Sequence, residues 1–282
     1  MGTDQMNAMH EVKGAREVEW RRDGRWGGAI TSRPLPPEDL TIDGLSADRR
    51  AIASQVWLAR AASERRVSDA FAIVRDALVA LDAAPALVDL AARAVDDEIR
   101  HAELSRVVAS RYAGVELPHP ERLRLAVPSH AGASKPLRHV LHVVGQCCLN
   151  ETIASAFLEA AIRDARAPIA RAALRELLSD EIDHARIGWG LLASLDPGAR
   201  REVGRWLPAL AIANLRMWRE APRTYPDDPL LAAHGAPCLE VVEDALLVAF
   251  RELVVPGAEA LGISTGELRA WLREGAPTDR VD

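Results

Sequence analysis

Apolar side chains recur every three to four positions over most of the chain from residue 46 onward, which is the period of an amphipathic α-helix. Proline, glycine and polar clusters separate the periodic segments. The spacing predicts four long helices and three shorter ones, over residues 46–81, 85–112, 136–164, 168–195, 199–220, 238–254 and 264–273. No segment alternates with the period of a strand, so the predicted fold class is all-α.

The lengths of the connections suggest how these helices are arranged. The first two helices and the next two are joined by short turns, whereas a long link with several prolines, residues 113–134, separates the pairs. This order predicts a four-helix bundle with one long crossover, plus extra C-terminal helices. The expected organisation is an N-terminal arm or linker over 1–45, with a short hairpin around Asp23–Gly24, the bundle over 46–198, and a helical extension packed on it over 199–282.

Each of the four long helices carries a glutamate on its apolar stripe, where a core helix should be apolar. In two helices a histidine follows that glutamate by three residues, on the same face. At ~1.5 Å rise per residue, the glutamates of each helical pair are level to within about one turn. The side chains concerned are Glu64, Glu98, His101, Glu151, Glu181 and His184.

Four glutamates at one level of a dry core would repel one another, and burying unpaired charge costs several kcal/mol per ion. Two divalent metal ions would compensate, because four carboxylates and two neutral imidazoles then form an almost neutral site. Oxygen ligands with imidazole suit iron or manganese better than zinc. We therefore expect two Fe ions, with a mixed Mn/Fe pair left open, and the six side chains as metal ligands and catalytic residues.

The local sequences around these positions resemble those of a known protein family. The segments "SERRVSDAFA", "DDEIRHAEL", "GQCCLNETIASA" and "SDEIDHARIGW" resemble those of bacterial ferritin-like domain proteins, within the ferritin-like di-iron carboxylate superfamily. The resemblance implies a two-metal site with bridging glutamates and O2 as co-substrate. It also implies that His101 and Glu98 mainly serve one metal, and His184 and Glu181 the other.

Further residues are expected to support the site. In di-iron monooxygenases, an aspartate before the motif glutamate accepts a hydrogen bond from a ligand histidine, and the resemblance assigns this role to Asp97 and Asp180. Ser68 and Ser155, each four residues after a ligand glutamate, are expected at the metal cavity. Cys147 could line the pocket or lie in the buried core, and the core position is favoured. Three other helix acids are expected to be solvated: Glu103, Glu159 and Glu176.

Three functions are compatible with this site. The favoured one is a non-haem di-iron oxygenase or oxidase acting on a small organic substrate by hydroxylation, N-oxygenation or desaturation, since the extra C-terminal helices could wall a substrate pocket. The alternatives are a ferroxidase or iron-handling protein like bacterioferritin, and a non-catalytic, metal-stabilised helical protein. Leu177 stands where p-aminobenzoate N-oxygenases have an extra histidine, which weakens arylamine N-oxygenation. Tyr112 and Tyr225 lie outside the ligand stripes, which argues against a radical-storing subunit.

The composition limits which kinds of binding partner are expected. The net charge of −6 favours neither nucleic acid nor an anionic membrane surface. The three cysteines include no Cys-x-x-Cys pair, which excludes a rubredoxin-like module. The sequence has no apolar run long enough for a signal peptide or a membrane span, so a soluble cytoplasmic protein is expected. The expected partners are a small-molecule substrate and an external reductase as electron donor, and a homodimer is left open.

Overall fold

The computed structural model describes residues 35–220 and 226–277. Within these ranges the chain is helical and contains no strand, which confirms the predicted all-α class. The hairpin expected around Asp23–Gly24 lies outside the described residues. The elements are α1 (Ala47–Ala80), α2 (Pro85–Ala113), α3 (Lys135–Val143), η1 (Val144–Asn150), α4 (Glu151–Asp164), α5 (Pro168–Ser194), α6 (Pro197–Glu220), α7 (Pro229–Ala233), α8 (Leu239–Val248), η2 (Ala249–Val254), α9 (Val255–Ala260) and α10 (Gly266–Arg273).

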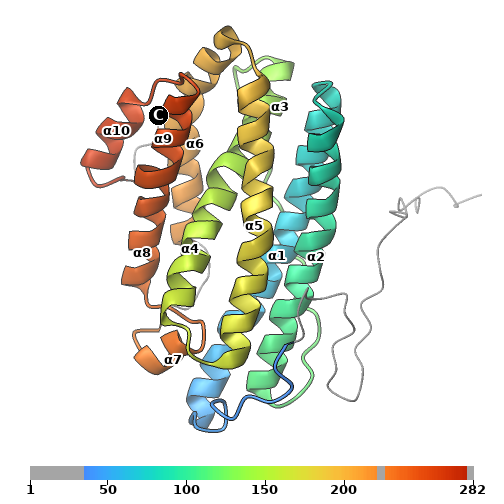
Figure 1. Ribbon diagram of the computed structural model, residues 1–282, viewed down its shortest axis with the longest axis vertical. Helices are drawn as coiled ribbons and strands as arrows, with labels where there is room; N and C mark the ends of the chain where they lie inside the picture. Colours follow the sequence, from blue (N-terminus) through green and yellow to red (C-terminus); the bar gives the residue numbers. More distant parts are fainter. Residues whose placement is uncertain (1–34, 221–225, 278–282) are drawn as a thin grey trace, which may run out of the picture.

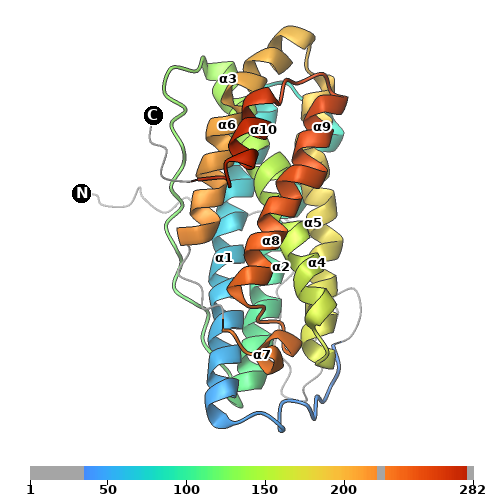
Figure 2. The same ribbon diagram turned by 90° about the vertical axis from the view of Figure 1, so that its left-hand side faces the viewer.

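The longest helices run side by side along the long axis of the molecule (Figure 1). Helix α1 packs on α2, and α5 packs on both α2 and α4. Helix α8 and the π-helix η2 cover the outer side of α4, while α6 packs against η1. The link between α2 and α3 runs along the length of the molecule (Figure 2), so it connects the end of α2 to the start of α3 at the opposite end of the molecule.

The ends of the first helices follow from local sequence. The hydroxyl of Ser46, the N-cap of α1, accepts a hydrogen bond from the Arg49 backbone N–H at 3.3 Å. Pro85 begins α2 at a position where its missing N–H is not needed. Gly114 ends α2 with φ at 70°, a left-handed conformation that favours glycine. Local chemistry therefore sets the length of both helices that form the first pair.

The third predicted helix, residues 136–164, contains a π-helical segment, η1, that the apolar period does not reveal. In η1 the Glu151 backbone N–H bonds to the Gln146 carbonyl, five residues back instead of four. Opposite this segment, a Cβ on Gly188 of α5 would lie 2.6 Å from Cys148 Sγ and 2.8 Å from Cys147 Cβ. Glycine at 188 therefore allows η1 and α5 to approach closely beside Glu151.

One hydrophobic core extends through the predicted domain boundary at residue 198. It joins Leu35 and Ile42 of the predicted arm, Trp57 of α1, and Phe250 and Trp271 of the C-terminal helices. The helices predicted over 238–254 and 264–273 appear as α8–η2–α9 and α10, and the short α7 was not predicted. Every helix in the described ranges falls short of the length and apolarity that crossing a bilayer requires.

Candidate metal centre

Four helices bring the six predicted side chains together in the interior. Helix α1 supplies Glu64, the first residue of α4 is Glu151, and α2 and α5 each supply a Glu-x-x-His pair. The donor atoms form two groups of four, and within each group they lie within 4.8 Å of one another. One group contains Glu64, Glu98, His101 and Glu181, and the other contains Glu98, Glu151, Glu181 and His184.

Glu98 and Glu181 belong to both groups, so they occupy the centre of the site. His184 Nδ1 lies 3.1 Å from Glu98 Oε1 and 2.9 Å from Glu181 Oε2. His101 Nδ1 lies 3.4 Å from Glu181 Oε1 and 3.7 Å from Glu98 Oε2. Each histidine thus faces carboxylates of both helices, and the glutamates that distinguish the two groups are Glu64 and Glu151.

The site is closed to solvent on most sides. Glu98 and His101 are fully buried, and Glu151, Glu181 and His184 are no more than 2% exposed, while Glu64 is partly buried. Both oxygens of Glu98 and Nδ1 of His101 are buried without a hydrogen bond from any described residue. Leaving such groups unsatisfied is costly. The two groups combine carboxylate oxygens with imidazole nitrogens, a set of donors that could hold a divalent metal ion.

Nε2 of each histidine faces an aspartate that precedes a motif glutamate. The aspartate belongs to the other helix, not to the helix that carries the histidine. His101 Nε2 of α2 lies 3.0 Å from Asp180 Oδ2 of α5, and His184 Nε2 of α5 lies 3.5 Å from Asp97 Oδ2 of α2. The Arg100 guanidinium contacts both aspartates, Asp97 at 3.2 Å. Asp180 can therefore accept the Nε2 proton of His101, which makes Nδ1 the nitrogen that faces the carboxylates. His184 Nε2 has no hydrogen-bond partner among the described residues, although Asp97 is near.

Burial and mutual repulsion perturb the carboxyl groups. Burial, with the charges of Glu98 and Glu181, raises the pKa of Glu64 to about 8. Burial, and next the charge of Glu181, also raises the pKa of Glu151. For Glu181, burial acts in the same direction, but the neighbouring histidines outweigh it and lower the pKa. Without metal, the cluster therefore balances its charge by holding protons on some members.

The histidines are perturbed in the complementary direction. Burial alone would lower the pKa of His101, but its hydrogen bond to Asp180 and its contacts with the carboxylates of Glu181 and Glu98 raise it well above the usual value. The pKa of His184 is raised likewise, with the charge of Glu181 as the main opposing cause to burial. Since metal ligands must be deprotonated, a cation entering this site has to displace protons.

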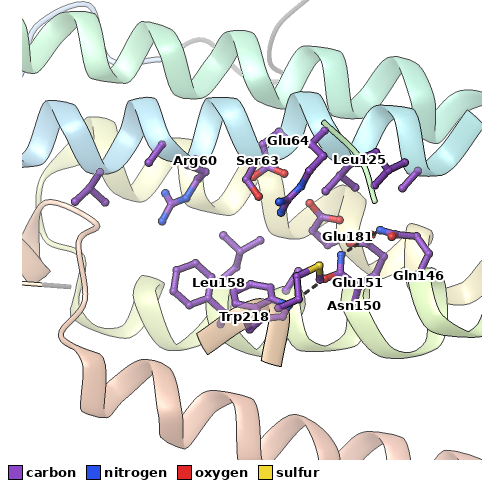
Figure 3. A pocket seen from close by; sticks show the side chains of 18 of the residues that line it. Arg60, Ser63, Glu64, Leu125, Gln146, Asn150, Glu151, Leu158, Glu181 and Trp218 are labelled. Carbon is purple, nitrogen blue, oxygen red and sulfur yellow. Dashed lines mark hydrogen bonds between the residues drawn. The ribbon is translucent and has the colours of Figure 1, made fainter. Parts of the chain in front are cut away.

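A cavity opens onto the site carboxylates Glu64, Glu151 and Glu181 (Figure 3). Its walls come from α1, the link before α3, η1, α4, α5 and α6. Its volume of about 90 Å³ admits several water molecules or a small organic molecule. The lining mixes polar and apolar side chains, among them Ser63, Gln146, Asn150, Phe157, Leu158 and Trp218.

The predicted pocket residues Ser68, Cys147 and Ser155 are not among those that line this cavity. On α1 the cavity meets the side of Glu64 that carries Ser63 and Val67, positions i−1 and i+3, and the i+4 position of Ser68 faces away. Ser68 Oγ instead donates to the Arg65 carbonyl at 2.8 Å. A prediction from spacing alone could not tell on which side of the glutamate the cavity would open.

On α4 too, the residue four positions after the site glutamate does not line the cavity, and here a π-turn precedes the helix. Ala154 and Leu158 line the cavity, three and seven residues after Glu151, whereas Ser155 does not. Cys147 packs in the core with Phe71 and Ile187, as the favoured interpretation expected. Because η1 makes i to i+5 bonds, Gln146 takes the cavity position instead, and its amide donates to Glu151 Oε1.

Sequence reasoning missed several residues at the cavity. The Asn150 amide donates to Glu151 Oε1 at 3.3 Å, and the Trp218 indole donates to Asn150 Oδ1 at 2.9 Å. Arg60 stands one turn before Glu64, a spacing that could have suggested it. No local signal marks Trp218, because its place depends on how α6 packs against η1.

Two of the three acids expected to be solvated are buried, so that expectation was wrong for them. Glu103 is 7% exposed and pairs with Arg106 at 2.6 Å. Glu176 is 8% exposed and pairs with Arg100 at 3.3 Å. Only Glu159 is exposed. An arginine partner compensates the charge of each buried carboxylate, and the helical period does not reveal such a partner.

Neither the models of protein families nor the curated proteins contain a match to this chain.

Proposed function

We propose that the protein is an O2-dependent di-iron oxygenase or oxidase built on a ferritin-like four-helix bundle, with a Mn/Fe pair as the other metal composition. The side chains that would hold the ions are Glu64, Glu98, His101, Glu151, Glu181 and His184. Glu98 and Glu181 belong to both groups of donor atoms, so each would be available to either ion. His101 and His184 would bind through Nδ1, since Nε2 of each faces an aspartate.

The chemistry of such a centre requires electrons from outside. Two ions held by these residues would supply the redox chemistry for O2 activation. Insertion of one oxygen atom of O2 into a substrate, with the other leaving as water, needs two electrons and two protons, and an external reductase would have to supply the electrons. The chain's own residues orient the histidines, exclude water and shape the substrate space. Asp180, held by Arg100, would keep the imidazole of His101 in one tautomer, and Asp97, also held by Arg100, lies near Nε2 of His184.

The observation that carries the proposal is the cavity at Glu64, Glu151 and Glu181. A ferroxidase needs only a path for iron, whereas here an indole from α6 and aromatic and aliphatic side chains from α4 form a mixed wall beside the carboxylates. That wall is suited to an organic molecule, because ligand sites combine apolar surface with a few placed polar groups. The iron-handling and purely structural functions become outcomes of the test.

The test combines metal analysis with O2 consumption. Purified protein should contain about two iron ions per chain, and the reduced protein should consume O2 in a single turnover that leaves iron bound. Glu98→Ala should lose both metal and O2 consumption, while Glu159→Ala, at an exposed position of α4, should behave as the unmodified protein. Repeated oxidation of added Fe(II) with release of ferric mineral would establish the ferroxidase instead. Tight iron binding without O2 consumption would leave only a structural metal.

A further inference from the structure

The link between α2 and α3 supplies one side chain to the cavity wall. Leu125 lines the cavity together with Glu64, whereas every other lining residue except Pro237 belongs to a helix. The link runs along the outside of the helices (Figure 2), and Leu125 lies on the α1 side of the cavity (Figure 3). A segment without secondary structure therefore closes part of the cavity.

Both ends of the link are fixed by contacts with helices. At its start, the Leu117 backbone N–H donates to Ser110 Oγ of α2 at 3.0 Å. At its end, His130 is 9% exposed, and its ring centroid lies 4.8 Å from that of His142 on α3. Movement of the link is thereby confined to residues 118–129.

The middle of the link is held by side chains alone. Among the described residues, positions 118–129 take part in no hydrogen bond between backbone groups. Arg122 pairs with Asp69 of α1, with Nε 3.0 Å from Oδ2, and His119 Nδ1 lies 3.6 Å from Glu103 Oε2. The side chains of Arg122 and His119 are 62% and 79% exposed, so solvent weakens both pairs. A segment with few buried contacts opens at a low cost in free energy.

The cavity wall next to this segment contains the least buried member of the metal centre. Glu64 is partly buried, whereas the other five side chains of the site are no more than 2% exposed. Of residues 118–129, all of which are described, only Pro120 and Leu125 are not exposed. Movement of Leu125 away from the helices would therefore open the cavity to solvent on the side of Glu64.

We propose that residues 118–129 form a gate through which small molecules reach the cavity. Leu125 blocks the entrance, and the ion pair between Arg122 and Asp69 holds the segment closed. Since the gate regulates access to the same site, this inference rests on the proposed function. The segment can swing outward between its fixed ends without unwinding a helix, and its closure excludes water from the cavity.

The test measures entry into the cavity without relying on metal. The parent for the test is the full-length protein with two substitutions. Ala154→Cys places a thiol on the α4 wall of the cavity, and Cys238→Ser removes the one native cysteine that is not buried. The rate at which methyl methanethiosulfonate, a small neutral reagent, modifies this thiol reports access to the cavity. The protein with Cys238→Ser alone gives the background rate.

Two further substitutions in this parent should open the gate. Asp69→Asn breaks the ion pair without changing the cavity lining and should raise the rate about 2- to 5-fold. Leu125→Ala removes the blocking side chain and should raise it about tenfold. Added salt should raise the rate of the parent but not that of Asp69→Asn, because it screens an exposed ion pair. Exchange of the two charges, Asp69→Arg with Arg122→Asp, should return the rate toward that of the parent.

Two matched controls should keep the rate of the parent. Asp76→Asn breaks another exposed ion pair of α1, the one with Arg75. Leu123→Ala changes a leucine of the link that is 37% exposed and does not line the cavity. If Asp69→Asn and Leu125→Ala react no faster than these controls, the gate is overturned, as it is if the thiol reacts in none of the proteins. Circular dichroism checks that each variant keeps the helical content of the parent.

Metal analysis of the same substitutions in the protein with its native cysteines separates the two proposals. If iron loads and O2 is consumed but the thiol rates do not depend on Asp69 and Leu125, the gate fails and the proposed function stands. If the thiol rates change as expected but iron does not load, the gate stands and the di-iron function fails.

Discussion

The two helical pairs carry nearly the same motif but hold it differently. In the first pair, α1 is a regular α-helix and its glutamate, Glu64, is partly buried beside the cavity. In the second pair, a π-turn precedes α4, and Glu151 is 1% exposed with amide donors from Gln146 and Asn150. The comparison shows that one carboxylate is held by polar neighbours, while the other borders the space available to a ligand.

The positions between the motif residues differ as well. Arg100 stands inside the first motif, and the equivalent position of the second is Asp183. Arg100 contacts both aspartates that face the histidines, whereas Asp183 pairs with Arg93 on the neighbouring helix at 3.1 Å. The first pair therefore supplies the cations and the second supplies additional acid, so the similar halves are complementary in charge.

The largest expected effect comes from a shared ligand. Glu181→Ala should remove nearly all bound metal, because Glu181 belongs to both groups of donor atoms. Glu64→Ala affects one group only and should leave about one ion per chain, held by the group that includes Glu151. Metal analysis of the purified variants measures both. Equal loss in the two variants would show that the groups do not bind independently.

The next largest effect is expected at Gly188, where α5 and η1 of the second helical pair lie close together. Gly188→Ala puts a Cβ 2.6 Å from Cys148 Sγ and 2.8 Å from the Cys148 backbone nitrogen. Forcing these elements apart should cost about 1–3 kcal/mol of unfolding free energy and lower metal content by displacing Glu151. Denaturant unfolding with metal analysis tests this.

The matched control is Gly145→Ala within η1, where the added Cβ meets Leu210 at an ordinary 3.7 Å. This variant should keep its stability and its metal. A Gly188→Ala protein that is as stable as the control would show that α5 and η1 can separate without cost.

A smaller effect should distinguish the two aspartates. Asp180 lies 3.0 Å from its histidine and Asp97 lies 3.5 Å from the other, so Asp180→Asn should weaken metal binding more. Removing such a partner typically lowers metal affinity by about 10- to 100-fold. Competition with a chelator compares the variants, and a greater loss in Asp97→Asn would reverse the assigned order.

The last expected effect is a pH dependence of stability that has opposite signs with and without metal. Folding raises the pKa of Glu64 from 4.5 to about 8, so the metal-free folded protein keeps a proton that the unfolded chain releases within that window. Its stability should therefore fall as pH rises between these values. Stabilisation by metal should increase over the same range, because fewer protons need displacing.

Thermal unfolding at several pH values, with and without iron, measures both slopes. Glu64→Gln should flatten the slope of the metal-free protein, since the amide does not titrate. A metal-free protein whose melting temperature rises with pH across this window would contradict the protonated carboxyl.

The sequence alone determined much of the fold and the identity of the clustered residues. The helical period, and the prolines and glycines that separate the periodic segments, act through neighbours in the chain, so they predicted to within a few residues where the long helices begin and end. The glycine cap at Gly114 was seen only in the structure. The same period placed each glutamate and histidine on a buried face. A charged side chain on such a face is conspicuous, which is why the six residues could be named before their contacts were known.

Only the tertiary structure decided which side of the site is open and what lines it. Helical spacing relates residues on one helix, whereas the cavity depends on how α1, η1 and α6 pack against one another. Because of this packing, each histidine of α2 or α5 faces an aspartate of the other helix. Ser63 and Gln146 line the cavity where Ser68 and Cys147 were expected, and Trp218 of α6 lines it as well. Those contacts join residues far apart in sequence, and no local pattern encodes them.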